Sequence, residues 1–261
     1  MSRFRADWLR LREPYDHAAR SAALAAAFAG ALGPEPQLID LGCGTGSNAR
    51  FLKSLLPAGQ RWIMVDHDAA LLEQARLELE RSRIEARLQP LDLARGLPDA
   101  ADCNGITASA LLDLASAAWL DRLAGWCRGR PLLIALTFDG RLGWQPVSAD
   151  DEAIRQRFLA HQRSDKGFGR ALGADAASYL AHRLEGEGQR VVTAASDWRL
   201  GPADAPLLAA MLDGITAALA ELREPDEAWA RLRRRQLAAG QLHLTVGHLD
   251  LLALPTGIAR G

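Results

Sequence analysis

Cysteine is scarce in this sequence, and neither sign of charge is in excess. The chain of 261 residues has 3 cysteines, an odd number, and no CxxC spacing, which argues against a disulfide framework and against a zinc site. The formal net charge is −1 and the pI is near 6.6, so no overall field attracts nucleic acid or an anionic membrane. We therefore expect no metal and no nucleic-acid partner, and a reducing, cytoplasmic location.

Long apolar runs are also missing. No stretch reads as a membrane span, and the first 17 residues carry charges where a secretory signal would need an apolar core. Asp7, Glu13 and Asp16 weigh against a mitochondrial presequence as well. These features predict that no membrane is a partner.

Short apolar runs alternate with helical patterns from residue 36 onward, which is typical of a parallel sheet with right-handed crossovers. The interposed segments, such as "DAALLEQARLELERSR", place apolar residues at helical spacing. The candidate strands are 37–42, 61–66, 86–92, 104–111, 131–139, 190–200 and 242–255.

The alternation breaks after the fifth candidate strand. Residues 140–175 are polar, contain several glycines and are only partly helical, and a second helical insertion spans 203–239. No internal repeat or low-complexity linker separates these parts. We therefore expect one domain over 1–261, with an N-terminal helical segment at 1–34 and the remainder of the sheet at 176–261.

Aspartates follow successive candidate strands. Asp40, Asp66 and Asp92 are each 26 residues apart, and Asp139 ends the fifth strand. Because the carboxyl ends of parallel strands meet at one edge, these carboxylates should line one cleft. Any one of these aspartates could instead be a helix N-cap. Capping alone does not account for an aspartate at the end of every one of these strands.

The stretch "LIDLGCGTGSNAR" places Gly42, Gly44 and Gly46 on the turn after the first strand, where bare backbone admits a ligand. The loop lacks the GK[ST] of a P-loop, and its GxGxG spacing departs from the GxGxxG of dinucleotide sites. With no lysine or arginine in the loop and a row of carboxylates beside it, the ligand should carry hydroxyls, an amine and positive charge. S-adenosylmethionine meets that description.

These motifs, with "WIMVDHDAALLEQAR" and "LQPLDLA", resemble the class I S-adenosylmethionine-dependent methyltransferases over residues 36–139. The resemblance implies an α/β, Rossmann-like, doubly wound and mostly parallel seven-stranded sheet with helices on both faces and an antiparallel last strand. It implies that Asp40 and the loop hold the methionine moiety, that Asp66 accepts from the ribose hydroxyls, and that S-adenosylhomocysteine is the product. The donor-contacting residues carried over by position are Asp40, Gly42, Cys43, Gly44, Gly46, Asp66, His67, Asp92, Leu93, Ser109 and Leu111.

Asp113 and Tyr15 are the candidates for catalysis. The fourth strand leads into "TASALLDLAS", which lacks the NPP[YFW] of branches that methylate amino groups of DNA and of protein glutamine. Asp113 there could be a general base or a substrate anchor, or could cap a helix. In the N-terminal segment, which resembles the lids of small-molecule relatives, Tyr15 and Arg20 are candidates, with helix-surface packing as the alternative.

The segment 140–175 is interpreted as a cap over the methyl acceptor, because long loops are more often functional than idle. A solvated charged loop with a few buried aromatics is the alternative. The basic run "RLRRR" at 231–235 is interpreted as a solvated or interface helix face. The candidate acceptor residues in the cap are Arg141, Trp144, His161, Lys166 and Arg170.

The sequence thus predicts methyl transfer to a small molecule by a monomer or homodimer. Two alternatives keep the same donor: a protein that binds it without turnover, and a methyltransferase acting on a macromolecule. A nicotinamide dehydrogenase is a third interpretation, but it would need the glycine spacing that is absent.

Overall fold

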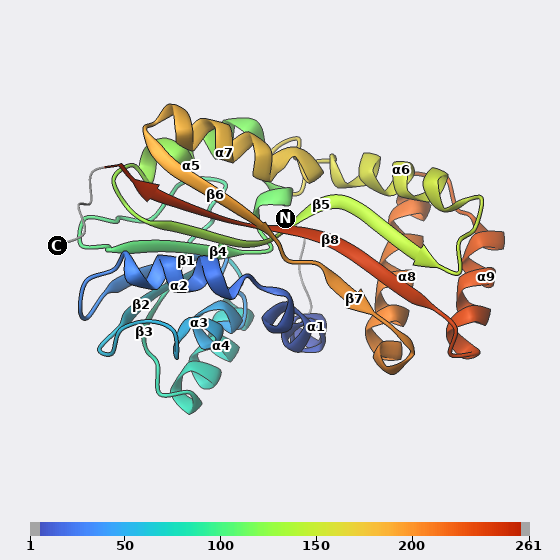
Figure 1. Ribbon diagram of the computed structural model, residues 1–261, viewed down its shortest axis with the longest axis horizontal. Helices are drawn as coiled ribbons and strands as arrows, with labels where there is room; N and C mark the ends of the chain where they lie inside the picture. The colour runs from blue at the N-terminus through green and yellow to red at the C-terminus, as the bar shows by residue number, and fades with distance from the viewer. Residues whose placement is uncertain (1–5, 257–261) are drawn as a thin grey trace.

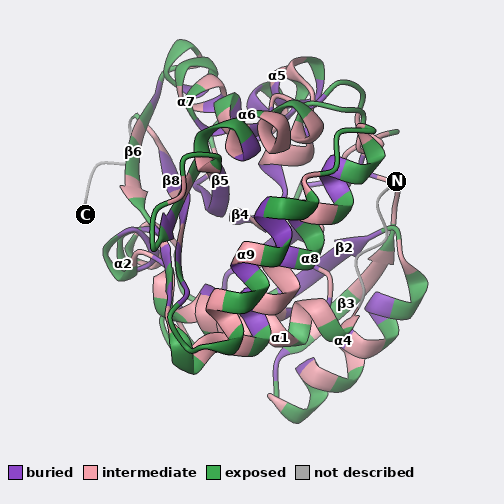
Figure 2. Ribbon diagram, turned by 90° about the vertical axis from the view of Figure 1, so that its right-hand side faces the viewer, coloured by how far each residue is buried: buried purple, intermediate pink, exposed green. Residues whose placement is uncertain are grey.

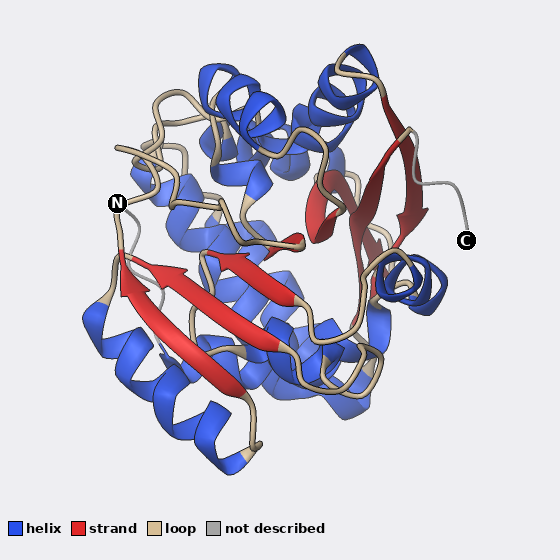
Figure 3. Ribbon diagram, turned by 90° about the vertical axis from the view of Figure 1, so that its left-hand side faces the viewer, coloured by secondary structure: helices blue, strands red, loops and turns tan. Residues whose placement is uncertain are grey.

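The architecture is an eight-stranded, mostly parallel sheet with helices on both faces, seen in a computed structural model that describes residues 6–256 (Figures 1 and 3). The strand order is β3-β2-β1-β4-β5-β8-β6, with β7 paired to β8. β8 is antiparallel to β5 and β6. The Rossmann-like fold and its antiparallel last strand are therefore confirmed. The strands are β1 Gln37–Leu41, β2 Arg61–Asp66, β3 Glu85–Pro90, β4 Gly105–Ser109, β5 Leu132–Gln145, β6 Gln189–Ala195, β7 Trp198–Leu200 and β8 His243–Pro255.

Helices cover both faces of the sheet, so β1 and β2 bury nearly every residue and read as continuous apolar runs. One face packs on α2, α3 and α4 through a core that includes Phe28, Leu52 and Leu79. The other packs on α5 and α7 through a core that includes Trp119 and Leu180. The helices are α1 Ala6–Ala19, α2 Ala22–Gly30, α3 Ser47–Leu52, α4 Ala69–Arg81, α5 Ala117–Trp126, α6 Asp151–Gln162, α7 Ala176–Gly186, α8 Ala205–Glu221 and α9 Glu227–Ala238.

The candidate strand at 190–200 is two strands, so the prediction of seven strands was one short. β6 pairs with residues 249–255 of β8, whereas β7 pairs with residues 244–246. Between them, the backbone N–H of Ser196 donates to the His248 carbonyl at 2.9 Å, and the Asp197 carboxylate accepts from the His248 N–H at 3.3 Å. These contacts fix the short gap between β6 and β7 next to the part of β8 where its pairing with β5 shifts register.

Residues 140–145 continue β5 instead of opening a loop, which corrects the expected start of the cap. Leu142 and Trp144 pair with Val246 and Leu244 of β8 beyond a register shift. The extension is stable because Trp144 is buried against Trp229 of α9, with ring centroids 5.5 Å apart. The long β5 and β8 therefore extend past the main sheet and carry α6, α8 and α9 (Figure 1). We call residues 140–162 and 198–246 the helical lobe.

Helix α8 is apolar because it supplies the core of the helical lobe. Pro202–Glu221 is the one described helix that is long and apolar enough to cross a membrane by length and composition, which the sequence analysis had not identified. Its Leu207, Leu208, Leu212 and Ile215 are buried in that core. Figure 2 shows buried and exposed residues alternating along this end of the molecule. Packing within the lobe accounts for these buried leucine and isoleucine side chains.

The basic run at 231–235 is not entirely a solvated face, because Arg233 is fully buried. Its guanidinium donates to the Asp151 carboxylate and to the Pro146 carbonyl. The guanidinium carbon lies 5.2 Å from the centre of the Trp144 ring and 5.8 Å from that of Trp229. A buried cation is tolerated only when it is paired in this way.

Replacing Arg233 by Met should lower stability by about 3–5 kcal/mol, because Asp151 would lose the partner of a buried ion pair. Arg235→Met is the matched control, since Arg235 is exposed on the same helix, and its effect should stay within about 0.5 kcal/mol. Urea unfolding of the two variants makes the comparison. Equal midpoints would show that the buried pair contributes no stability.

Candidate functional site

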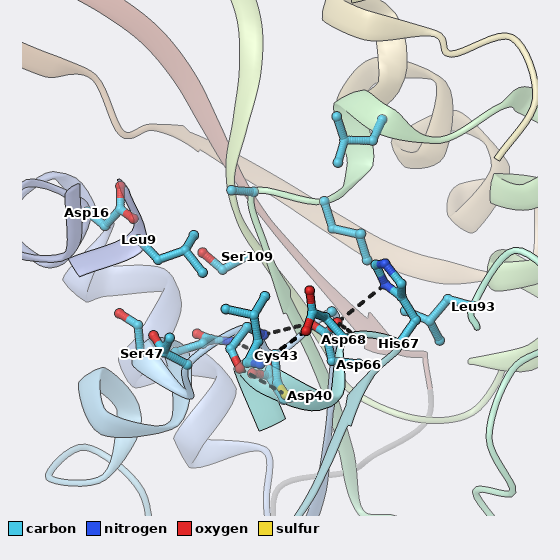
Figure 4. A pocket seen from close by; sticks show the side chains of 18 of the residues that line it. Leu9, Asp16, Asp40, Cys43, Ser47, Asp66, His67, Asp68, Leu93 and Ser109 are labelled. Carbon is cyan, nitrogen blue, oxygen red and sulfur yellow. Dashed lines mark hydrogen bonds and ion pairs between the residues drawn. The ribbon is translucent and has the colours of Figure 1, made fainter. Parts of the chain in front are cut away.

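A cavity opens at the carboxyl ends of β1, β2 and β4, beside the point where the strand order reverses. Doubly wound sheets bind ligands at such switch points. Leu9 and Asp16 of α1 lie at one end, His67 and Leu93 at the other, and Asp66 between them (Figure 4). The other lining residues are Arg12, Asp40, Gly42, Cys43, Gly44, Thr45, Ser47, Asn48, Asp68, Leu71, Leu91, Ser109, Ala110, Leu111, Leu114, Lys166 and Phe168.

Asp40, at the end of β1, is the most deeply buried acid of the cavity, with 1% of its surface exposed. Its Oδ1 accepts from Asn48 Nδ2 at 2.6 Å and from Thr107 Oγ1 at 2.8 Å. Its Oδ2 has no hydrogen-bond partner within the described residues. Burial raises the pKa of Asp40 to about 6, although Asn48 and Thr107 oppose this shift. The unpaired oxygen is suited to a ligand that donates a hydrogen bond or carries positive charge.

The Asp66 carboxylate accepts hydrogen bonds from the glycine loop and from the backbone that follows β2. Gly44 N donates to Asp66 Oδ2 at 2.9 Å, and Asp68 N donates to Asp66 Oδ1 at 3.0 Å. Gly44 has a φ of +53°, and a Cβ there would lie 3.2 Å from Leu9 Cδ1. Glycine is therefore required both for its backbone conformation and for the close approach of α1. Gly46 faces Leu79 and does not line the cavity.

The far end of the cavity holds His67 and Leu93 as predicted, but it does not hold Asp92. Asp92 Oδ1 accepts from Ala94 N at 3.0 Å, and Oδ2 lies 3.2 Å from Arg95 Nε. This local turn occupies the carboxylate, so the cavity wall here is formed by the residues on either side of it. His67 Nδ1 lies 3.4 Å from Asp66 Oδ1.

Ser109, Ala110 and Leu111 line the middle of the cavity, whereas Asp113 lies outside it. The N-cap of α5 is Ser116, whose hydroxyl accepts from Trp119 N, so Asp113 is not that cap. Desolvation raises the pKa of Asp113 to about 6, with opposing contributions from the backbone of Asp113 and from Arg12. Its role as a base stays a prediction.

The two residues predicted for the N-terminal lid lie away from the cavity. The Tyr15 hydroxyl donates to Asp204 Oδ1 at 3.0 Å, in the helical lobe. Arg20 is buried behind the cavity, where its Nη1 donates to Asn48 Oδ1 at 2.5 Å. Arg20 therefore supports the amide that holds Asp40. Neither residue lines the cavity.

Of the five acceptor residues proposed in the cap, Lys166 alone lines the cavity. Arg141 pairs with Asp139 and Asp197 on the surface, and Trp144 is in the core of the helical lobe. His161 Nε2 lies 2.7 Å from Glu221 Oε2, and Arg170 is exposed.

Sequence reasoning missed several lining residues, chiefly those of α1. Leu9, Arg12 and Asp16 are spaced three and four residues apart, which places them on one helix face. That spacing was visible, but nothing in it distinguishes a cavity wall from ordinary packing. The other missed polar residues are Thr45, Ser47, Asn48 and Asp68, of which Ser47 and Asn48 begin α3 directly after the loop.

The charges of the cavity fit the donor inferred from the sequence. The cavity is lined by four aspartate carboxylates and by two basic side chains, Arg12 and Lys166. The glycine loop itself contains no basic residue. Within residues 6–256 no cluster of His, Cys, Asp or Glu could hold a metal ion. The open oxygen of Asp40 suits an ammonium group, and Asp66 lies where vicinal hydroxyls can reach it. The fold and this site are those of a doubly wound protein whose cavity suits a cationic nucleoside.

Comparison with known proteins agrees with this class. Residues 38–128 match the family described as "Methyltransferase domain". None of the curated proteins matches the chain in sequence.

Solved structures share the fold at low identity. A methyltransferase from Geobacter sulfurreducens in complex with S-adenosylhomocysteine has a TM-score of 0.51 and 15% identity, covering 98% of this chain and 100% of that one. A methyltransferase from Thiobacillus denitrificans, also in complex with S-adenosylhomocysteine, has a TM-score of 0.51 and 15% identity, covering 96% of this chain and 99% of that one. The cyclopropane synthase MmaA2 from Mycobacterium tuberculosis has a TM-score of 0.52 and 13% identity, covering 96% of this chain and 94% of that one.

The matched residues include β1, the glycine loop, β2 and β4, which build most of the cavity. The chain therefore contains a stretch that matches a methyltransferase domain, within a fold that it shares with solved methyltransferases.

Asp66→Ala should weaken S-adenosylhomocysteine binding roughly ten- to a hundredfold, because hydrogen bonds to a charged group contribute about 1.5–3 kcal/mol. Asp92→Ala is the matched control, and it should change the dissociation constant by less than about threefold because Asp92, unlike Asp66, does not line the cavity. Calorimetric titration measures both. An equal loss in the two variants would contradict the placement of the ribose at Asp66.

Donor affinity should fall as the pH is lowered through about 6, because protonation removes the Asp40 charge that faces a cationic ligand. The unliganded protein should respond in the opposite direction. A raised carboxyl pKa stabilises the folded state fully below the unfolded pKa, and this contribution is lost as the pH rises through about 6.

Asp40→Asn should flatten both pH dependences, since the amide keeps an oxygen for Asn48 and Thr107 but cannot ionise. Titrations and thermal melts between about pH 4 and 8 provide the measurement. Asp113→Asn is the control, because it removes an acid of similar pKa that lies outside the cavity. If Asp113→Asn alone flattened donor binding, the pH dependence would not belong to Asp40.

Proposed function

We propose that the protein transfers the methyl group of S-adenosylmethionine to a small, anionic acceptor molecule. The observation that carries this proposal is the covering of the cavity from two sides. α1 contributes Leu9, Arg12 and Asp16, and the loop 163–172 contributes Lys166 and Phe168. A site enclosed in this way favours a small acceptor over a macromolecular surface.

The loop 163–172 is held next to the cavity by contacts with Ala115 and with α5. Leu172 N donates to the Ala115 carbonyl at 2.9 Å, and Phe168 forms a bridge with Ala115. The Phe168 ring packs edge-on against Trp119 of α5, with centroids 5.3 Å apart. This loop is the part of the predicted cap that covers the cavity, and its attachment gives the acceptor a fixed wall.

The bound donor supplies a methyl group on a sulfonium, which is already activated for displacement. The protein therefore has to hold the two reactants in line and to exclude water. Asp40 and Asp66 fix the donor end of the arrangement, as described above. Leu9, Leu111 and Leu114 provide apolar parts of the cavity wall, where water would otherwise compete with the acceptor.

Lys166 is the cation best placed to hold an acceptor. Its Nζ contacts His161 Nδ1 at 3.4 Å, whereas Arg12 is engaged with Asp16 through two hydrogen bonds. Partial burial lowers the pKa of Lys166, and Glu221 opposes this shift. An acceptor carboxylate or phosphate would pair with the ammonium in this partly desolvated position.

Lys166→Met should raise the acceptor's Michaelis constant by roughly ten- to a hundredfold and leave the donor's dissociation constant unchanged. Arg170→Met is the matched control, because Arg170 lies in the same loop, is exposed and does not line the cavity. Label from methyl-tritiated S-adenosylmethionine, followed into carboxylated and phosphorylated metabolites, identifies the acceptor for this assay. Label found in protein or nucleic acid, or equal effects of both variants, would contradict the proposal.

A further inference from the structure

We propose that His161 is a positioning residue for the acceptor: it holds the Lys166 ammonium group at the cavity, and Glu221 fixes the imidazole from behind. The inference deepens the function proposed above and rests on it. It concerns side chains of the helical lobe and of the loop 163–172, which lie outside the matched region 38–128. His161 itself does not line the cavity, so it acts through Lys166 and not by touching the acceptor.

Three side chains from three parts of the fold form this series of contacts. Glu221 ends α8, His161 lies in the last turn of α6, and Lys166 follows in the loop 163–172. His161 Nε2 lies 2.7 Å from Glu221 Oε2, and His161 Nδ1 lies 3.4 Å from Lys166 Nζ. The two ring nitrogens therefore face different partners, one in the helical lobe and one at the cavity.

The two partners determine which ring nitrogen of His161 carries the proton. A carboxylate only accepts hydrogen bonds, so Nε2 must donate to Glu221. An ammonium group only donates, so Nδ1 must accept from Lys166. The arrangement thus requires the neutral tautomer with its proton on Nε2. Glu221 is largely exposed, with 71% of its side chain accessible, so its pair adds little stability. Its effect is to orient the ring.

The backbone on both sides of Lys166 is also held. Asp165 Oδ1 accepts from Gly167 N at 2.7 Å and from Gly169 N at 3.0 Å. Gly167 and Gly169 have φ values of +107° and +84°, which residues with a Cβ rarely adopt. This turn fixes the start of the lysine side chain, while His161 fixes its ammonium group.

A lysine held at both ends is suited to bind an anion. Ordering a long, flexible side chain opposes binding, and this cost falls when the protein has already ordered it. One N–H of the ammonium is directed to His161 Nδ1, so the two remaining N–H groups are available to a carboxylate or phosphate in the cavity. The contact from His161 therefore sets the place where the anionic group of the acceptor binds.

The tautomer of His161 gives a test that needs neither donor nor acceptor. In the nitrogen-15-labelled protein, two-dimensional NMR separates protonated from unprotonated ring nitrogens, and the spectrum of His161→Gln identifies the His161 signals by their loss. We expect a protonated Nε2 and an unprotonated Nδ1, with the Nδ1 signal shifted by Lys166→Met and not by Arg170→Met. A proton on Nδ1, or an Nδ1 signal unchanged by Lys166→Met, would overturn the proposal.

Two replacements of His161 separate its two contacts. Asparagine can place its amide oxygen near the position of Nδ1 and accept from Lys166, whereas glutamine can place its amide nitrogen near that of Nε2 and donate to Glu221. With the acceptor found by tritium labelling, His161→Gln should raise the acceptor's Michaelis constant about three- to tenfold and leave kcat unchanged. His161→Asn should raise it less than about twofold. His182→Gln is the control, since His182 is exposed on α7.

A double variant separates positioning from a structural role. In the Lys166→Met background there is no ammonium to hold, so His161→Gln should change the Michaelis constant by less than about twofold. An effect as large as in the unaltered background, or equal effects of glutamine and asparagine, would overturn the proposal. Failure of Lys166→Met itself to raise the Michaelis constant would instead reject the proposed function, and the NMR result is independent of that outcome.

Discussion

The burial of the Asp40 carboxylate is the constraint on which the site depends. A carboxylate nearly removed from water must be compensated by hydrogen bonds or by a cation. Asn48 and Thr107 satisfy one oxygen, and Arg20 supports Asn48 from behind. The remaining oxygen has no protein partner, so this end of the cavity suits a positively charged group better than a phosphate.

The long strands β5 and β8 determine how that cavity is closed. They belong to the main sheet at one end and to the helical lobe at the other, so the two parts share a backbone (Figure 1). α1 contacts both parts. Trp8 packs edge-on against Trp198 of β7 at 6.3 Å, while Glu13 pairs with Arg50 beside the glycine loop. The wall formed by α1 is thus positioned by side chains from distant parts of the sequence.

Most of the sheet and the central part of the site were predictable, because they depend on local patterns. Continuous apolar runs give buried parallel strands, and glycines directly after a strand indicate close approach of a ligand. Asp40 and Asp66 were found on this basis, and both line the cavity. Asp92 fits the same pattern, yet its carboxylate closes a local turn, which strand-end position alone cannot distinguish.

The remaining errors concern features that tertiary packing decides. Residues 140–145 read as a polar loop because glycine and charged residues hide the alternation of Leu142 and Trp144. Arg233 read as solvated because its partner, Asp151, is distant in sequence. Leu9, Arg12 and Asp16 occupy one helix face, but the cavity they line is formed only when α1 meets the glycine loop.

A crystal structure with S-adenosylhomocysteine tests the central claim most directly, namely that one cavity holds the donor in a defined orientation. We expect the purine beside His67 and Leu93, the ribose hydroxyls on Asp66, and the amino-acid end between Asp40 and α1. Density for the ligand in the reverse orientation, or at any other place on the protein, would contradict it.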